Sequence, residues 1–182
     1  MKMLHQDIFE ELMSEQEIND TVDKIAAQIN RDYAGKSVIV VGVLKGSIMF
    51  LADLLRKLTI DDCQLDFVAA SSYSSGSVSS GKVKITKDIT CNPIGRDILL
   101  VEDILDTGNT LSYIKDHLMK MGAASVRICT LFDKPARRKQ PVTADYTGKT
   151  IDDLFIVGYG LDYSEHYRNL PYVGVLKSEI YS

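Results

Sequence analysis

The sequence predicts an α/β fold, in which a mostly parallel central sheet carries helices on both faces. Three observations lead to this prediction. Strand-like and helix-like segments alternate along the chain in the order of βαβ units. The strand-like runs are continuously apolar, as in strands buried within a parallel sheet. The length of 182 residues fits one domain with a substantial core but is too short for two full-sized ones.

The first element is a helix over residues 15–33. Ser14 and Glu17 have the spacing of a capping box at its start, and Gly35 is a stop signal after its end. The apolar residues in between recur on one face at helical period: Ile18, Val22, Ile25, Ala26 and Ile29. This periodicity predicts an amphipathic helix.

Two βαβ units follow this helix. The first has a strand, a helix and a strand over residues 37–43, 48–58 and 64–70. The second has the same order over residues 97–102, 109–121 and 125–132. Further strands are predicted over residues 151–158 and 172–176, and we expect all these strands to form the mostly parallel sheet.

A segment rich in Ser and Gly, residues 71–82, separates the two units. Its composition predicts a mobile loop. The segment is longer than most connections, and long loops in compact domains often act as active-site lids. A lid is therefore the favoured interpretation, and a plain hairpin connector is the alternative.

Composition and charge argue against several classes of protein. Apolar residues make up 45% of the chain and charged residues 25%, which is ordinary for a soluble globular protein. No apolar run approaches the roughly 20 residues that span a bilayer, and the first fifteen residues do not resemble a signal peptide. We therefore expect a cytoplasmic protein with no membrane partner. The net charge of −4 does not favour nucleic acid as a partner.

The cysteines and histidines indicate neither a disulfide framework nor a zinc site. Cys63, Cys91 and Cys129 are odd in number, far apart and without any CxxC pair. The three histidines are equally scattered and show no spacing that would converge on a metal ion. We expect the cysteines to be reduced.

The most informative stretch is VEDILDTGNTL, residues 101–111. Val101 ends a predicted strand and the next helix starts near Thr110, so the turn between them lies at the carboxyl end of a strand, where α/β sheets bind ligands. Gly108 allows a tight turn. The N–H groups at the helix start and the hydroxyls of Thr107 and Thr110 can bind a phosphate group.

Three carboxylates, those of Glu102, Asp103 and Asp106, lie beside this predicted phosphate site. Their mutual repulsion is unfavourable unless a ligand compensates for it, and ribose hydroxyls or Mg²⁺ would do so. The alternative is an ordinary strand-to-helix turn with Asp and Thr as N-caps. The combination of buried strand, adjacent acids and glycine turn instead favours a pocket for a ribose 5-phosphate.

VEDILDTGNTL resembles the phosphoribosyl pyrophosphate motif of the type I phosphoribosyltransferases. Five further segments resemble the hypoxanthine (hypoxanthine-guanine) phosphoribosyltransferases in order and spacing: LKGS at 44–47, SY at 72–73, LFDKP at 131–135, FIVGY at 155–159, and LDY at 161–163 followed by Arg168. The resemblance covers residues 14–176. It implies a single domain over residues 1–182, with a small hood built from the N- and C-terminal segments.

The resemblance also implies an activity. Phosphoribosyl pyrophosphate would donate its phosphoribosyl group to hypoxanthine or guanine, giving IMP or GMP and pyrophosphate in purine salvage. Mg²⁺ would be the cofactor, and a homodimer or homotetramer is common in the family. The Leu44–Lys45 peptide is often cis in these enzymes.

The resemblance assigns eleven residues to phosphoribosyl pyrophosphate. Glu102 and Asp103 would hold the ribose hydroxyls, and the turn 107–110 the 5-phosphate. The pyrophosphate would bind Arg168 and the backbone of the Lys45-Gly46 pair. The whole set is Lys45, Gly46, Ser72, Tyr73, Glu102, Asp103, Thr107, Gly108, Asn109, Thr110 and Arg168, and the implied metal ligands are Glu102, Asp103 and Asp162.

The purine would bind residues from the second half of the chain. Asp106 is the implied general base at purine N7, and Lys134 would donate to the 6-oxo group. Phe155 would stack on the base, and Ile156 would offer backbone hydrogen bonds. Asp162 completes this set and would hold a magnesium ion shared with pyrophosphate.

Each of these residues has an ordinary alternative when taken singly. Phe155 alone would be a core residue, and Lys134 and Arg168 would be solvated charges. Because Lys134 and Phe155 suit any 6-oxopurine, a xanthine-preferring enzyme stays open. A nucleic-acid-binding regulator with the same fold is the other alternative, but the acidic segment before residue 37 predicts one helix and the basic cluster 137–139 predicts a solvated turn.

Overall fold

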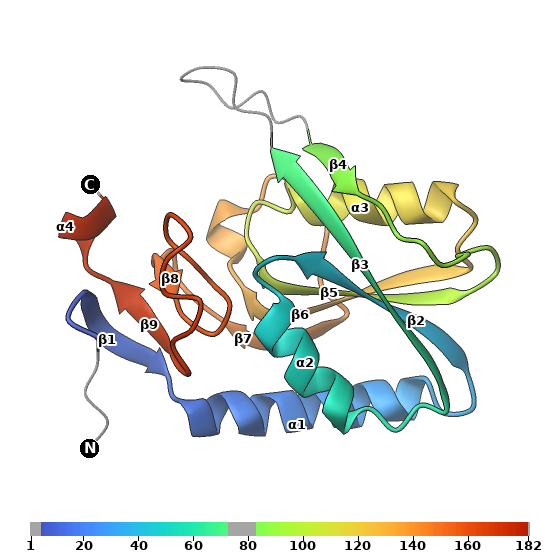
Figure 1. Ribbon diagram of the computed structural model, residues 1–182, viewed down its shortest axis with the longest axis horizontal. Coiled ribbons are helices and arrows are strands. Elements are labelled where there is room, and N and C mark those ends of the chain that lie inside the picture. Colours follow the sequence, from blue (N-terminus) through green and yellow to red (C-terminus); the bar gives the residue numbers. More distant parts are fainter. Residues whose placement is uncertain (1–4, 73–82, 182) are drawn as a thin grey trace.

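The computed structural model describes residues 5–72 and 83–181 (Figure 1). In chain order its strands are β1 (Ile8–Met13), β2 (Ser37–Leu44), β3 (Asp62–Ser72), β4 (Val83–Lys87), β5 (Asp97–Leu105), β6 (Ser125–Asp133), β7 (Tyr146–Thr150), β8 (Ile156–Val157) and β9 (Val173–Leu176). The helices are α1 (Glu15–Asp32), α2 (Ile48–Lys57), α3 (Asn109–Lys120) and α4 (Ser178–Tyr181). None of the helices in these two ranges is both long and apolar enough to span a membrane.

A six-stranded sheet forms the centre of the molecule, with strand order β4-β3-β2-β5-β6-β7. The pairs β3–β2, β2–β5, β5–β6 and β6–β7 are parallel, and only β4 pairs antiparallel at its edge. The predicted mostly parallel sheet is therefore confirmed. Because these strands are parallel, the segments that follow β2, β5 and β6 lie at the same end of the sheet, where the carboxyl ends of the strands meet.

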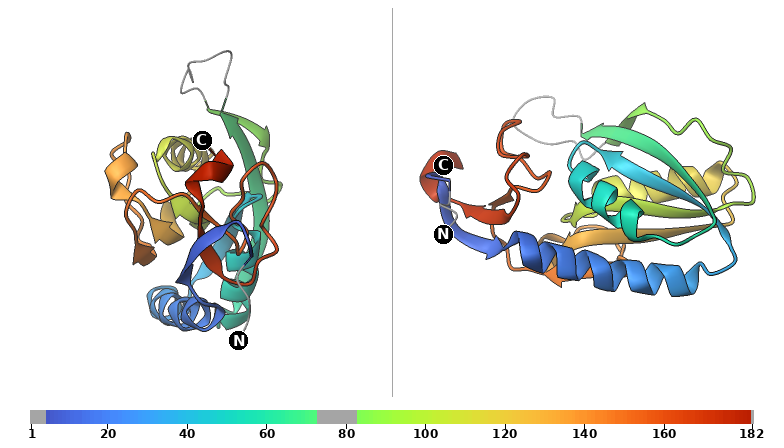
Figure 2. Two further views of the ribbon diagram at one scale, coloured as in Figure 1. Left: turned by 90° about the vertical axis from the view of Figure 1, so that its left-hand side faces the viewer. Right: turned by 60° about the horizontal axis from the view of Figure 1, so that its bottom comes forward.

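Helices cover both faces of this sheet, as predicted. Figure 2 (right) shows α1 and α2 in front of the sheet and α3 behind it. Alternate residues of each strand face opposite sides. Val38 and Val40 pack with α1 and α2, and Ile39 and Val41 pack with α3.

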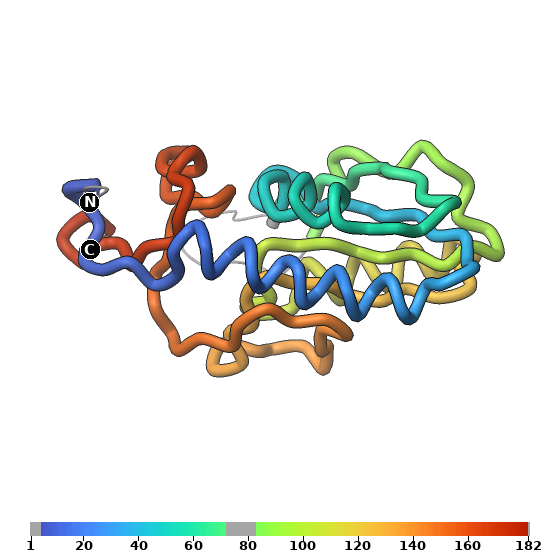
Figure 3. The backbone as a smooth tube through the Cα atoms, turned by 90° about the horizontal axis from the view of Figure 1, so that it is seen from below, coloured from blue at the N-terminus to red at the C-terminus, as the bar shows by residue number. Residues whose placement is uncertain are grey.

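Helix α1 begins with the predicted capping box. The Glu17 N–H donates to Ser14 Oγ at 3.3 Å, and the Ser14 N–H donates to Glu17 Oε2 at 2.8 Å. The five apolar residues predicted to share one face are all buried. Figure 3 shows that α1 runs alongside much of the molecule and joins β1 at one end to the central sheet.

A second, three-stranded antiparallel sheet with the order β1-β9-β8 lies at the end of the molecule where both termini lie (Figure 1). The N-terminal segment contributes β1, and the C-terminal segment contributes β8 and β9. This sheet is the small hood implied by the resemblance. It stands beyond the carboxyl ends of β2, β5 and β6.

Several strand predictions were wrong. Residues 151–158 were expected as one strand of the central sheet, but only Ile156–Val157 is extended and it belongs to the hood, as does β9. The missed strands β1, β4 and β7 have mostly half-exposed or exposed side chains, so they carry no continuous apolar run. The acidic segment before residue 37 therefore contains β1 as well as the predicted helix.

The Ser- and Gly-rich segment joins two antiparallel strands. Strand β3 continues to Ser72, which pairs with Val83 in β4. Residues 73–82, and with them Tyr73 and the predicted lid, lie outside the described residues. The structure therefore leaves the lid as a prediction.

Candidate active site

Three segments meet where the parallel strands end. Lys45 and Gly46 follow β2, the turn 106–108 follows β5, and Lys134 follows β6. Strand β5 is three residues longer than predicted, so Glu102 and Asp103 lie within it and point to opposite sides of its backbone.

Two adjoining cavities lie where these parallel strands end. The first, of about 200 Å³, is lined by residues 102–108, 110 and 111. The second, of about 290 Å³, is lined by Asp103, Ile104, Asp106, Lys134, Arg137, Phe155, Ile156, Leu161 and Asp162. The two cavities share Asp103, Ile104 and Asp106. These cavities therefore bring together most of the residues that the sequence assigned to the two substrates.

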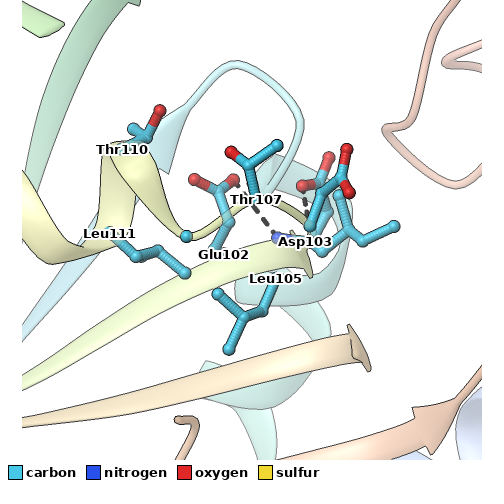
Figure 4. A pocket seen from close by; sticks show the side chains of 9 residues that line it. Glu102, Asp103, Leu105, Thr107, Thr110 and Leu111 are labelled. Atoms are coloured by element: carbon cyan, nitrogen blue, oxygen red, sulfur yellow. Dashed lines mark hydrogen bonds between the residues drawn. The ribbon is translucent and has the colours of Figure 1, made fainter. Parts of the chain in front are cut away.

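The turn after β5 has the geometry of an anion site. Gly108 has a φ of +79°, and a Cβ built on it would lie 2.5 Å from Val142 Cγ1, so only glycine fits here. Within the part of the chain that is described, the N–H groups of Thr107 and Gly108 donate to no acceptor. Figure 4 shows Glu102, Thr107 and Thr110 projecting to one side of the turn, with Leu105 and Leu111 on the other.

Glu102 and Asp103 form a pair of acidic groups beside this turn. The pKa of Glu102 is raised well above its ordinary value, first by burial and second by the Asp103 carboxylate. Burial also raises the pKa of Asp103. Each carboxylate accepts one backbone hydrogen bond, Glu102 from the Asp103 N–H at 3.3 Å and Asp103 from the Ile104 N–H at 2.7 Å. The pair therefore favours a ligand that brings hydroxyl donors or a cation.

The acidic residues suit Mg²⁺ in part. Their oxygens are the hard ligands that this ion prefers, but no group of three possible metal ligands converges among residues 5–72 and 83–181. Asp162 is held apart, because its Oδ1 is 2.8 Å from Arg168 Nη2 and its Oδ2 accepts the Glu165 N–H at 2.9 Å. A magnesium ion commonly takes one or two carboxylates and completes its shell with substrate oxygens and water. The residues present fit that arrangement.

The segment after β2 lies against the same carboxylates. The Leu44–Lys45 peptide is cis. A side chain on Gly46 would overlap the Asp103 carboxylate, and one on Gly160 would overlap the Gly46 carbonyl oxygen, so both glycines permit close approach. Lys45 Nζ is 2.9 Å from Glu165 Oε2.

Arg168 is not the solvated surface charge that its residue type alone would suggest. Its side chain is 22% exposed, and besides Asp162 it contacts the Gly160 carbonyl, to which Nη1 donates at 2.7 Å. The Arg168 guanidinium and the Lys45-Gly46 segment are thus both held against Gly160.

Lys134 and Phe155 form the other side of the second cavity. Lys134 is only 5% exposed, which excludes the solvated alternative. Its Nζ donates to the Leu154 carbonyl at 2.7 Å and is 3.5 Å from Asp153 Oδ1. An ammonium group has three protons, so one donor is left for a ligand. The Phe155 ring stacks on Tyr181 with centroids 4.7 Å apart.

Asp106 lines both cavities, and few polar groups surround its carboxylate. Its Oδ1 is buried and accepts no hydrogen bond from the described residues, and the nearest cation, Arg137 Nε, is 3.7 Å away. This carboxylate oxygen therefore has hydrogen-bonding capacity that the described residues do not use.

One prediction about this region was wrong in part. The basic cluster 137–139 was expected to be a solvated turn, and Arg137 and Lys139 are exposed. The Arg138 side chain, however, is only 16% exposed and donates to the carbonyls of Leu105 and Asp106. Nothing in the sequence distinguished Arg138 from its basic neighbours, because its acceptors are 32 and 33 positions away.

Ser72 lies at the end of β3, and Asn109 begins α3 next to the glycine turn. Ile156 is buried in β8, and its backbone pairs with Val175. Tyr181 is a contact of the site that sequence reasoning missed, since its partner Phe155 lies 26 positions earlier and no short motif connects the two.

Comparison with known proteins gives a consistent result. A family model described as phosphoribosyl transferase domain matches residues 9–164. The hypoxanthine-guanine phosphoribosyltransferase of Streptococcus pneumoniae is 51% identical over 180 residues, or 99% of each chain, and that of Streptococcus mutans is 50% identical over the same share. A solved hypoxanthine phosphoribosyltransferase from Staphylococcus aureus has a TM-score of 0.93 at 47% identity and covers 98% of this chain and 96% of its own. The chain therefore belongs to the phosphoribosyl transferase domain family.

Proposed function

We propose that this protein transfers the 5-phosphoribosyl group of phosphoribosyl pyrophosphate to hypoxanthine or guanine, with release of pyrophosphate, in purine salvage. The observation that carries the proposal is the pair of cavities joined at Asp103 and Asp106. One contains an anion-binding turn, and the other contains a buried lysine and an aromatic ring. The names of the 51% identical relatives support the same substrates.

Phosphoribosyl pyrophosphate would occupy the first cavity. The free N–H groups of Thr107 and Gly108, with the start of α3 at Asn109 and Thr110, would bind the 5-phosphate. Glu102 and Asp103 would accept hydrogen bonds from the ribose hydroxyls. Lys45, Gly46 and Arg168 would bind the pyrophosphate, and Ser72 and Tyr73 complete the set of residues proposed for phosphoribosyl pyrophosphate.

Mg²⁺ bound with phosphoribosyl pyrophosphate would supply positive charge to the departing pyrophosphate. Glu102 and Asp103 are residues that would hold such an ion, and Asp162 would hold a magnesium ion shared with pyrophosphate. As the C1–O bond breaks, positive charge develops on the ribose ring, and the adjacent carboxylates stabilise that charge.

The purine would occupy the second cavity. The remaining proton of Lys134 would be donated to the 6-oxo group, whereas the 6-amino group of adenine would leave this buried donor without an acceptor. Phe155 would stack on the base, and Ile156 would form backbone hydrogen bonds with it. Asp106 would take the proton from N7 as N9 attacks C1 of the ribose.

Two finer points extend the proposal. The relatives' names favour hypoxanthine and guanine over xanthine, although Lys134 suits any 6-oxopurine, and they favour an enzyme over a nucleic-acid-binding regulator. The family resemblance favours a cytoplasmic homodimer or homotetramer.

The test is a comparison of five bases under identical conditions. The purified protein, with Mg²⁺ and phosphoribosyl pyrophosphate, is assayed for nucleotide formation from hypoxanthine, guanine, xanthine, adenine and uracil. We expect the highest kcat/KM for hypoxanthine and guanine, with adenine and uracil at least about 10²-fold lower. Absence of turnover with every purine would contradict the proposed reaction, and preference for xanthine would correct the substrate.

A further inference from the structure

Arg138 makes an unusual set of contacts beneath the turn proposed to bind the 5-phosphate. Its Nε donates to the Asp106 carbonyl at 2.9 Å, and its Nη2 donates to the Leu105 carbonyl at 3.1 Å. Nη1 donates to the Val142 carbonyl at 2.6 Å, and Nη2 also forms an ion pair with Asp133. One guanidinium thus holds the end of β5, the start of the turn and the segment 138–142 together.

These contacts fix the direction of the peptide groups in the turn. In a trans peptide the carbonyl and the N–H point in opposite directions. Because the Asp106 carbonyl points to Arg138, the N–H of the same peptide, which belongs to Thr107, points away from it. The Thr107 carbonyl accepts from the N–H groups of Lys139 and Gln140 at 2.8 and 3.2 Å, so the Gly108 N–H also points away from this segment.

The segment 138–142 touches the turn at two more points. A Cβ on Gly108 would lie 2.5 Å from Val142 Cγ1 and 3.1 Å from Arg138 Cδ, so the segment packs directly against that glycine. Gln140 Nε2 donates to Asn109 Oδ1 at 2.9 Å at the start of α3. The segment 138–142 therefore supports the turn on the side opposite to the Thr107 and Gly108 N–H groups.

We propose that Arg138 is a positioning residue that orients the N–H groups of Thr107 and Gly108 for the 5-phosphate. The inference rests on the proposed function, because it takes the turn to be the phosphate site. Arg138 touches no substrate in this arrangement. Its effect is to hold the turn in the anion-binding geometry before the ligand arrives, which lowers the cost of ordering the site on binding.

The geometry requires arginine and not merely a positive charge. The planar guanidinium donates to three carbonyls and one carboxylate at once. A lysine ammonium has three protons on one atom and cannot reach acceptors spread around a flat group. Arg138→Lys therefore keeps the charge beside Asp133 but loses the simultaneous contacts with the Leu105, Asp106 and Val142 carbonyls.

The test compares two product-like ligands that differ only in the 5-phosphate. Dissociation constants for IMP and inosine are measured for the wild type, Arg138→Lys and Arg138→Ala. We expect both variants to bind IMP at least about tenfold more weakly, with inosine changed by less than about twofold. Arg31→Lys and Arg31→Ala, at an exposed position in the last turn of α1, are matched controls and should leave both constants unchanged.

A general structural role predicts a different pattern, since loosening of the whole site weakens inosine and IMP together. An unchanged ratio of the two constants in folded Arg138 variants would overturn the inference. If these variants do not fold, Asp133→Asn is measured instead, because it removes the carboxylate that anchors the guanidinium. It should lower the ratio of the dissociation constant for inosine to that for IMP. An unchanged ratio in this variant would equally overturn the inference. A wild type that binds IMP no better than inosine would instead contradict the proposed phosphate site.

Discussion

At the scale of single residues, the proposed roles of Asp106 and Lys134 rest on hydrogen-bonding capacity that the protein leaves unused. Asp106 Oδ1 is buried and accepts no hydrogen bond from the described residues, and Lys134 Nζ keeps one proton. Buried polar groups are usually satisfied within the protein, so such exceptions indicate a partner from outside. A purine with a proton on N7 and an oxygen on C6 would supply both partners.

Replacement of the Asp106 carboxylate tests this interpretation. We expect Asp106→Asn to lower kcat by about 10² or more, because an amide cannot accept the N7 proton. The KM values for both substrates should change little, since the side chain keeps its size. The measurement is steady-state kinetics with hypoxanthine, and Asp152→Asn, at an exposed acid three residues before Phe155, is the control. A kcat equal to that of the wild type removes Asp106 from the mechanism.

At the scale of elements, the connection from β5 to α3 combines strand, turn and helix start in one short segment. The strand places Glu102 and Asp103, the left-handed Gly108 reverses the chain, and α3 begins at Asn109. Gly108 has two constraints, a positive φ and contact with Val142. Gly35 shares the positive φ of +68° but has open space where a Cβ would lie.

The two glycines allow these constraints to be separated. We expect Gly35→Ala to lower the free energy of unfolding by about 1 kcal/mol, the cost of a left-handed alanine, without affecting catalysis. Gly108→Ala adds overlap with Val142, so it should cost more stability and raise the KM for phosphoribosyl pyrophosphate at least about tenfold. Urea unfolding and steady-state kinetics measure the two effects. Equal behaviour of the two variants would show that the contact with Val142 has no role in substrate binding.

At the scale of the whole molecule, the cavity proposed to bind the purine forms because the hood stands over the carboxyl ends of the central sheet. Lys134 follows β6 of the central sheet, whereas Phe155 and Ile156 belong to the hood segment. Contacts between the two parts fix their separation. Tyr159 donates its hydroxyl to Asp53 of α2 at 2.6 Å, and Lys149 of β7 donates to the Leu12 carbonyl of β1 at 3.1 Å.

The far edge of the central sheet depends on another buried acid. Asp66 of β3 accepts hydrogen bonds from the N–H groups of Phe67, Thr90 and Cys91 at 2.6–2.9 Å, so it ties the segment after β4 to the sheet. Burial alone would raise the pKa of Asp66, but these hydrogen bonds outweigh burial and hold the pKa well below its ordinary value. The folded state therefore favours the ionised form.

This shift determines how stability depends on pH. A folded-state pKa below the unfolded value of about 3.9 contributes stability above that pH, and the contribution is lost as the pH falls toward the folded-state value. We expect Asp66→Asn to lower the free energy of unfolding by about 1–3 kcal/mol at pH 7. The difference from the wild type should narrow below pH 4. Urea unfolding between pH 7 and pH 3.5 measures it, with exposed Asp61→Asn as the control, and a difference independent of pH would argue against the ionised Asp66.

The sequence by itself determined the βαβ order, the capped helix α1 and the turn of residues 101–111. These features are local. A capping box, a helical period and a strand followed by acids, glycine and hydroxyls are each written within a few consecutive residues. For the same reason the local pattern alone was enough to predict a phosphorylated ribose at the turn, and the Lys45, Lys134, Phe155 and Asp162 segments followed from resemblance in order and spacing.

Only the tertiary structure decided which of these residues share a cavity. In the structure, β8 and β9 belong to the hood and not to the central sheet, and the edge strands β1, β4 and β7 are added. Arg138 lies beneath the turn proposed to bind phosphate. Edge strands pair on one side only and have no apolar run to reveal them. The contacts of Arg138 with Leu105 and Asp106, and of Tyr181 with Phe155, join residues more than 20 positions apart. Such contacts depend on how the strands and helices pack, which local sequence patterns do not encode.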